Sequence, residues 1–202
     1  MTVANGERSD RRNRGDVVRA AGRLFAEQGF HGTSMRTLGE ELGLLGSSLY
    51  AHVGSKGELL EEIVSDGVHR CLALAASVAD GGAGPTDQLR FLINGHVTLV
   101  VDHLDTWTTF VNEYRFLPEE QRARVVVLRD SYQAEFRRII ERGVAAGDFR
   151  AGLDVHLVAT HILSILNAVA RWYRVDGAKT ASEVATSIFE LVIGGISRKV
   201  VT

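Results

Sequence analysis

Apolar residues recur every three or four positions along most of this chain, with polar residues between them. That spacing places the apolar side chains on one face of an α-helix. Runs that alternate apolar and polar residues between turn residues, as strands do, are not found in the sequence. The pattern therefore predicts an all-α fold.

Three short helices are predicted near the start of the chain, over residues 14–28, 35–42 and 46–52. Thr33 or Ser34 can cap the second helix, because a side-chain oxygen there accepts from a free backbone N–H. Gly43 can end it, because glycine takes the left-handed conformation without strain. Two short helices joined by a glycine turn are typical of a helix-turn-helix, which lays its second helix in the major groove of DNA.

Six further helices are predicted, over about residues 56–79, 86–103, 105–116, 119–147, 154–174 and 180–198. Ser55 with Glu58 and Thr180 with Glu183 fit capping boxes, and Thr86 is expected to cap the helix at 86–103. The last two helices carry apolar residues on more than one face, which favours burial on two sides. We therefore expect an N-terminal arm and three-helix DNA-binding head over residues 1–56. A larger helical ligand-binding and dimerisation body is expected over residues 57–202.

Composition fits a soluble cytoplasmic protein. The 202 residues are 45% hydrophobic, enough to bury a core, and the net charge of −2 requires any DNA affinity to come from locally placed charge. The single cysteine, Cys71, excludes an internal disulfide and fits a reducing compartment. The apolar runs are too short or too interrupted by polar residues to predict a membrane span.

Catalysis is not expected from the sequence. His96 with His103 and His156 with His161 lie on shared helices, but neither pair has the spacing and nearby acid of a helical zinc site. The sequence predicts no cofactor and no metal, and a helical enzyme is the least favoured of the functions considered.

A set of residues at fixed spacing spans the predicted head: Ala20-Ala21, Leu24-Phe25, Gly29-Phe30, Thr33-Ser34-Met35, Gly43, Leu49-Tyr50, His52 and Ser55-Lys56 with Leu59. At this spacing the head resembles the TetR family of bacterial transcriptional regulators. The resemblance implies a repressor that dimerises through its two C-terminal helices, binds a near-palindromic operator in double-stranded DNA, and is released by a small molecule.

DNA contacts are expected from the arm, the second and third helices and the start of the fourth. The candidates are Arg11, Arg12, Arg14, Thr33, Ser34, Arg36, Thr37, Ser47, Ser48, Tyr50, His52 and Lys56. The arm is either a disordered polar tail or a basic segment that follows phosphates or enters the minor groove, and the two interpretations are compatible. The resemblance assigns Tyr50, His52 and Lys56 to phosphates.

The third helix departs from the TetR pattern. Leu45 stands where the family usually has a capping hydroxyl, and Gly46 follows it. That helix also lacks arginine and lysine, so the common arginine-to-guanine contact is absent from it. This departure supports a second hypothesis, a TetR-like protein without sequence-specific DNA binding that acts through a protein partner.

Several segments of the second half, Phe110-Val111-Asn112-Glu113, Leu117-Pro118, Arg129, Tyr132, Gly147-Asp148-Phe149 and residues 167–174, resemble the TetR subgroup of lipid and sterol regulators. Many of that subgroup bind acyl-coenzyme A, so the resemblance implies such an effector or another hydrophobic ligand. The candidate pocket residues are Phe91, Trp107, Phe110, Tyr114, Phe136, Leu163, Asn167 and Arg171. Arg171 is the candidate for a phosphorylated head group. The alternatives are that the aromatic residues form plain core and that Arg171 forms a salt bridge.

Overall fold

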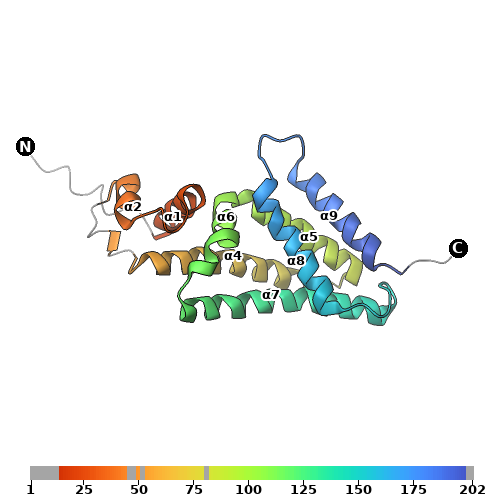
Figure 1. The fold of residues 1–202 in the computed structure, drawn as a ribbon. Helices are drawn as coiled ribbons and strands as arrows, with labels where there is room; N and C mark the ends of the chain where they lie inside the picture. The colour runs from red at the N-terminus through yellow and green to blue at the C-terminus, as the bar shows by residue number, and fades with distance from the viewer. Residues whose placement is uncertain (1–13, 45–48, 51–52, 80–81, 199–202) are drawn as a thin grey trace, which may run out of the picture. The chain divides into compact units, whose positions relative to one another are not determined.

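The structure is a computed structural model that describes residues 14–44, 49–50, 53–79 and 82–198 (Figure 1). Within these residues the chain forms eight α-helices and one short 3-10 helix, and no strand. The helices are α1 (Arg14–Gln28), α2 (Met35–Leu42), α4 (Lys56–Ala79), α5 (Pro85–Asp102), α6 (Leu104–Glu113), η1 (Tyr114–Phe116), α7 (Glu119–Ala146), α8 (Val155–Trp172) and α9 (Ala181–Ile196). The all-α prediction is confirmed.

The chain forms two compact units. Unit 1 contains Met1–Gly67 and Asp105–Val125, and unit 2 contains Val68–Leu104 and Val126–Thr202. The division differs from the predicted one, which cut the chain once between residues 56 and 57. In the structure α4 and α7 are each shared between the units, and α6 with η1 belongs to the same unit as α1 and α2.

The first two helices have the predicted bounds, because local signals set their ends. Gly29 follows α1 with φ 76°, and Gly43 follows α2 with φ 64°, both in the left-handed region that glycine tolerates. At the start of α2 the Ser34 hydroxyl accepts from the Thr37 N–H at 3.0 Å. Thr33, the alternative cap, is 1% exposed and donates its hydroxyl to the carbonyls of Leu24 and Gly29 at 3.2 and 3.1 Å. Ser34 is therefore the cap of α2.

Helix α6 packs against α1 inside unit 1. The Thr109 hydroxyl donates to the Gly22 carbonyl at 2.8 Å, and both residues are buried. A Cβ at Gly22 would lie 3.4 Å from the Thr106 hydroxyl, so glycine allows the two helices to approach. This packing explains why Asp105–Val125 is part of unit 1.

Unit 2 is built around α5, which contacts both α8 and α9 (Figure 1). Its core-facing residues Leu89, Leu92, Ile93, Val97 and Val100 are fully buried. The helix begins one residue earlier than predicted, with Gly84 as its N-cap and Pro85 in its first turn, so Thr86 is not the cap. Proline suits this position because the first-turn N–H groups have no partner within the helix.

The ends of α7, α8 and α9 are closed by local contacts. Gly147, φ 82°, follows α7, and the chain folds back so that the Phe149 N–H donates to the Gly143 carbonyl at 3.0 Å. Asp154 caps α8 through the Leu157 N–H at 2.9 Å. The predicted capping box at Thr180 and Glu183 is confirmed, since each side chain accepts from the other's backbone N–H, at 3.2 and 2.9 Å.

Candidate functional site

The start of α2 presents polar side chains to solvent. Ser34 and Arg36 are exposed and Thr37 is half-buried, with the Ser34 and Thr37 hydroxyl oxygens 2.8 Å apart. The Arg36 Nε donates to Glu40 at 2.9 Å, and the two side chains keep 88% and 63% of their exposure. An ion pair so exposed contributes little to stability, so it leaves the Arg36 guanidinium available to a partner.

Of the predicted third helix, over residues 46–52, the structure describes Leu49 and Tyr50, and it also describes Val53 just after it. Leu49 is helical and fully buried, Val53 is 1% exposed, and Tyr50 is helical with 55% of its surface exposed. Leu49 and Val53 therefore point into the core of unit 1, and the Tyr50 ring faces solvent. Ser47, Ser48 and His52, and Arg11 and Arg12 of the arm, lie outside the described residues.

Two of the predicted DNA-contact residues form side-chain hydrogen bonds within unit 1. The Thr33 side chain is buried, and its hydroxyl donates to two backbone carbonyls within unit 1. Arg14 is the first residue of α1, and its Nε donates to the Glu62 carboxylate of α4 at 2.9 Å, while 55% of the Arg14 side chain stays exposed. That hydrogen bond and the charge of Glu62 raise the pKa of Arg14 above its ordinary value. Glu62 lies 48 residues away in sequence, so local patterning could not have found the pair.

Lys56, the first residue of α4, is held within unit 1. Its Nζ donates to the Phe30 carbonyl at 2.7 Å and to the Thr33 carbonyl at 2.9 Å, and it lies 4.3 Å from the centre of the Phe30 ring. A lysine ammonium has three N–H donors, so these two bonds leave one donor and the positive charge for a phosphate. The helix itself begins as predicted, with the Ser55 hydroxyl accepting from the Glu58 N–H at 3.1 Å.

The predicted ligand-pocket residues divide between the two units. Trp107, Phe110 and Tyr114 lie in unit 1, where Trp107 and Phe110 are 2% and 7% exposed and their ring centres are 5.6 Å apart. The Tyr114 ring follows at 6.3 Å from Phe110. Within unit 1 Trp107 and Phe110 are buried, and Tyr114 is half-buried beside them.

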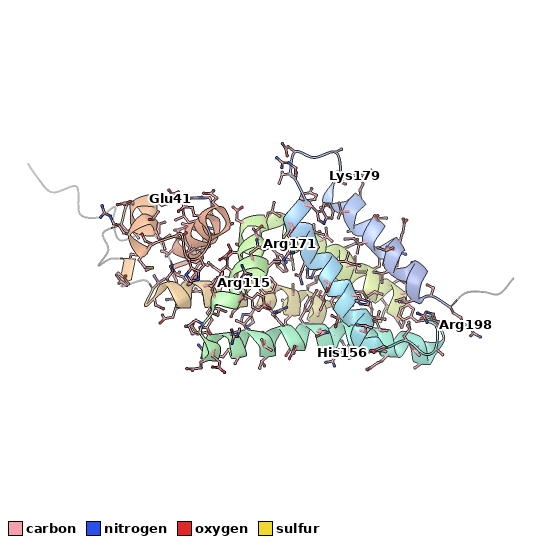
Figure 2. All side chains as sticks on the ribbon, in the orientation of Figure 1. Glu41, Arg115, His156, Arg171, Lys179 and Arg198 are labelled. Atoms are coloured by element: carbon pink, nitrogen blue, oxygen red, sulfur yellow. The ribbon has the colours of Figure 1, made fainter. Side chains whose placement is uncertain are left out.

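The other pocket candidates lie in unit 2. Phe136 is fully buried, with its ring edge-on to Tyr132 at 5.3 Å, and Leu163 and Asn167 are half-buried on α8. Phe91 is 52% exposed, so it points to solvent and does not line the interior of unit 2. Arg171 is exposed near the end of α8, and His156 is exposed near its start (Figure 2).

Unit 2 contains a buried polar cluster that the sequence did not predict. The His96 Nδ1 of α5 lies 3.2 Å from the Tyr132 hydroxyl of α7 and 3.9 Å from the Cys71 sulfur of α4. Burial lowers the pKa of His96 to about 3, against an opposing hydrogen bond with Asn167, and burial raises the pKa of Cys71 to about 12. The pKa of Tyr132 is also raised by burial, so all three groups are neutral at neutral pH. The sequence feature that indicates a buried His96 is its place on the apolar stripe of α5, four residues after Leu92 and four before Val100.

A largely apolar cavity of about 260 Å³ lies between α8, α9 and the segment before α8. It is lined by Arg150, Leu153, Val158, His161, Ile162, Ile165, Leu191, Val192, Gly195 and Ile196. On the same helices Leu157, Trp172 and Leu191 are 47%, 54% and 66% exposed. A Cβ at Gly194 or Gly195 would meet nothing within 4 Å, so α9 is open to close approach by another helix there.

Two protein families match different parts of the chain. Residues 17–63 match the family described as bacterial regulatory proteins, tetR family. Residues 82–196 match the tetracyclin repressor-like C-terminal domain. The first match covers most of α1, all of α2 and the start of α4, and the second covers α5 to α9.

Similarity to individual regulators extends over nearly the whole chain. The HTH-type transcriptional repressor KstR2 of Mycobacterium tuberculosis is 29% identical over 187 residues, covering 92% of this chain and 94% of the repressor. The solved structure of that ketosteroid transcriptional regulator has a TM-score of 0.86 at 26% identity, covering 95% of this chain and 99% of KstR2.

Two further solved structures share the fold. PfmR, a TetR family transcriptional regulator from Thermus thermophilus, has a TM-score of 0.83 at 33% identity, covering 90% of this chain and 99% of PfmR. AibR, solved in complex with isovaleryl coenzyme A and operator DNA, has a TM-score of 0.77 at 22% identity, covering 88% of this chain and 96% of AibR.

Proposed function

Because the chain belongs to the TetR family of bacterial transcriptional regulators, we propose that it is a homodimeric repressor of the bacterial cytoplasm. Its operator is a near-palindrome, and a small hydrophobic ligand releases the protein from it. The observation that carries the proposal is the head: a capped, exposed α2 start, an exposed Tyr50 beside a buried Leu49, and Lys56 at the first position of α4. This arrangement offers hydroxyl, aromatic and cationic groups to a DNA backbone.

The proposed dimer forms through α8 and α9. Helix α8 is long and apolar enough, by length and composition, to cross a membrane, yet only 28% of it is buried within the protein. Its buried residues Ala159, Ile162, Leu166 and Val169 place it in the body of unit 2, so a second copy is the proposed cover for its other face. Dimerisation would let two heads read half-sites about 34–36 Å apart, or a multiple of that distance.

The proposed effector is an acyl-coenzyme A thioester or another hydrophobic ligand. The relative KstR2 is a ketosteroid transcriptional regulator, and AibR was solved with isovaleryl coenzyme A, so the fold can hold such a thioester. Arg171, exposed near the end of an apolar helix, is the proposed contact for the phosphorylated head group. The coupling is reciprocal, so operator DNA should weaken ligand binding by the same factor that ligand weakens DNA binding.

Selection of bound duplexes from a random DNA pool, at two salt concentrations, tests the proposal. We expect a near-palindrome to be enriched, with affinity falling steeply as salt rises because lysine and arginine displace counterions from phosphates. Acyl-coenzyme A thioesters of increasing chain length are then added to the enriched duplex and its release is measured. Equal ligand affinity with and without operator would contradict the release mechanism.

The second candidate, a TetR-like protein that acts through a protein partner, is favoured by the uncharged segment from Leu45 to Val53. Replacing Tyr50 with alanine separates the two candidates, because 55% of its surface is exposed and the change should leave the core intact. The repressor proposal expects the substitution to abolish repression in the cell. The alternative expects function to remain intact.

A further inference from the structure

Phe30, in the turn between α1 and α2, is held by side chains from two other helices. Its N–H donates to the Glu113 Oε2 of α6 at 2.9 Å, and its carbonyl accepts from the Lys56 Nζ of α4 at 2.7 Å. Its ring packs edge-on against Phe25 at 5.4 Å and lies parallel to Phe116 at 6.4 Å. Phe30 is 8% exposed, so both backbone groups are largely withdrawn from water. One peptide segment thus joins a carboxylate of α6 to an ammonium of α4.

We infer that Glu113 is a positioning residue for DNA binding, because it fixes the turn against which Lys56 is held at the start of α4. The inference rests on the proposed DNA-binding function and adds a residue that the DNA-contact candidates did not include. Glu113 lies 83 residues from Phe30 in sequence, and it acts on Lys56 through the Phe30 backbone.

The physical reason is the flexibility of lysine. A lysine ammonium sits on a four-carbon stem, and ordering that stem on a phosphate costs conformational entropy. The Phe30 and Thr33 carbonyls order it before DNA arrives. They place its charge at the N-terminus of α4, where the helix dipole also favours an anion. This arrangement requires the Phe30 carbonyl to stay in place, and the Glu113 hydrogen bond fixes the same residue from its other side.

The test measures duplex affinity and its salt dependence for Glu113→Ala, Glu113→Gln, Lys56→Met and the double variant Glu113→Ala/Lys56→Met. A glutamine oxygen can still accept from the Phe30 N–H, so the glutamine variant keeps the hydrogen bond without the charge. Glu119→Ala is the matched control, since Glu119 is an exposed carboxylate of the same unit and its loss changes the net charge equally. Thermal unfolding of each variant confirms that it folds.

We expect Glu113→Ala to weaken binding about fivefold, as the loss of one hydrogen bond implies. Glu113→Gln and Glu119→Ala should bind like the wild type. Lys56→Met should flatten the dependence of log affinity on log salt by about one, because one cation no longer neutralises a phosphate. In the Lys56→Met background the Glu113→Ala change should have no further effect, because the residue through which it acts is gone.

Three results would overturn the inference: wild-type affinity for Glu113→Ala, an equal decrease in affinity for both Glu113 variants, or the same decrease with and without Lys56. The probe is the duplex enriched by the wild-type protein. If none is enriched, a duplex of random sequence at low salt takes its place, because phosphate contacts do not depend on sequence. Failure of sequence-specific binding would then contradict the proposed repressor. The affinities of the variants for the random duplex would still decide the role of Glu113. A wild-type protein that binds neither duplex would overturn both.

Discussion

His96 shows at the scale of one residue how burial fixes a charge state. It occupies a core position of α5, is 1% exposed, and meets the Tyr132 hydroxyl and the Cys71 sulfur inside unit 2. The apolar surroundings disfavour the imidazolium and lower the pKa of His96 to about 3. An unfolded chain has no such surroundings, so its histidine titrates near pH 6.5.

This difference predicts a pH dependence of stability. Below about pH 6.5 His96 is protonated in the unfolded state but stays neutral in the folded state. The free energy of unfolding therefore falls as the pH drops toward 3. Between pH 6.5 and pH 4 the decrease should be on the order of 3 kcal/mol. Urea unfolding of the wild type at a series of pH values measures it.

His96→Gln should remove most of that pH dependence, because glutamine has no titrating group. His69→Gln, at an exposed position of α4, is the matched control for the loss of a histidine. An equally steep decrease in acid for His96→Gln would show that other groups cause it.

Among individual side chains, the sequence predicted those whose neighbours are close in the chain. Ser34 is a cap because its partner is the N–H three residues ahead. The roles of Thr33 and Lys56 depend on carbonyls nine and 26 residues away, and that of Arg14 on a carboxylate 48 residues away. Such partners are set by tertiary packing, which periodicity alone does not encode.

At the scale of elements, the turn after α7 depends on a steric constraint at Gly143. A Cβ at Gly143 would lie 2.2 Å from the ring of Phe149, which is 1% exposed. The ring cannot move freely, because Phe149 forms a β-bridge with Ser197 and the following Arg150 N–H donates to the Ile196 carbonyl at 2.9 Å. The absence of a side chain at Gly143 therefore lets the turn fold back against the end of α9.

Gly143→Ala should destabilise the protein by about 1–3 kcal/mol, since overpacking a core forces side chains and backbone to shift. Gly67→Ala is the matched control: Gly67 lies in α4, and a Cβ there would meet Trp107 at an ordinary 3.6 Å. Alanine is the better helix former, so the control should be neutral or slightly stabilising. Thermal unfolding measures the stability of both variants. A Gly143→Ala variant as stable as Gly67→Ala would contradict this account.

The capping box of α9 leads to a second prediction at this scale, for the stability of the protein. Thr180→Ala removes the oxygen that accepts from the Glu183 N–H at 3.2 Å, and should cost about 1 kcal/mol. Thr186→Ala, at an exposed position within the same helix, removes a hydroxyl without removing this cap and serves as the control. Chemical denaturation measures the difference, and equal stabilities would show that the box contributes nothing.

Helix bounds were predicted well where a cap or a glycine marks the end, as for α1, α2 and the start of α9. The periodicity of α5 was also predicted, but the environment of Phe91 was not. Phe91 lies one residue from Leu92 and is exposed, while Leu92 is fully buried. A single sequence places both in an apolar stripe, and only the contacts of α5 with α8 and α9 define where that stripe ends.

For the whole molecule, the proposed dimer predicts a change of assembly. Leu191→Glu places a charge on the outer face of α9, where leucine is 66% exposed, and desolvating that charge in an interface is unfavourable. The variant should be a monomer at concentrations where the wild type is a dimer, by analytical ultracentrifugation. Its affinity for the enriched duplex should also fall, because the two half-sites would be bound separately.

Val127→Glu is the control for this experiment, since Val127 is 65% exposed on α7 and lies outside the α8 and α9 face. It should remain a dimer. Dissociation of both variants, or of neither, would argue against an interface formed by α8 and α9.

The packing of α6 on α1 has a consequence for any attempt to transplant the DNA-binding part onto another protein. Unit 1 is assembled from two stretches of chain, Met1–Gly67 and Asp105–Val125, and the second supplies Thr109 against Gly22 and Glu113 against Phe30. A chimera that joins only the first stretch to a foreign body would lack the surface that covers α1 and the turn after it. A working graft must therefore carry both stretches, although residues 68–104 separate them in the chain.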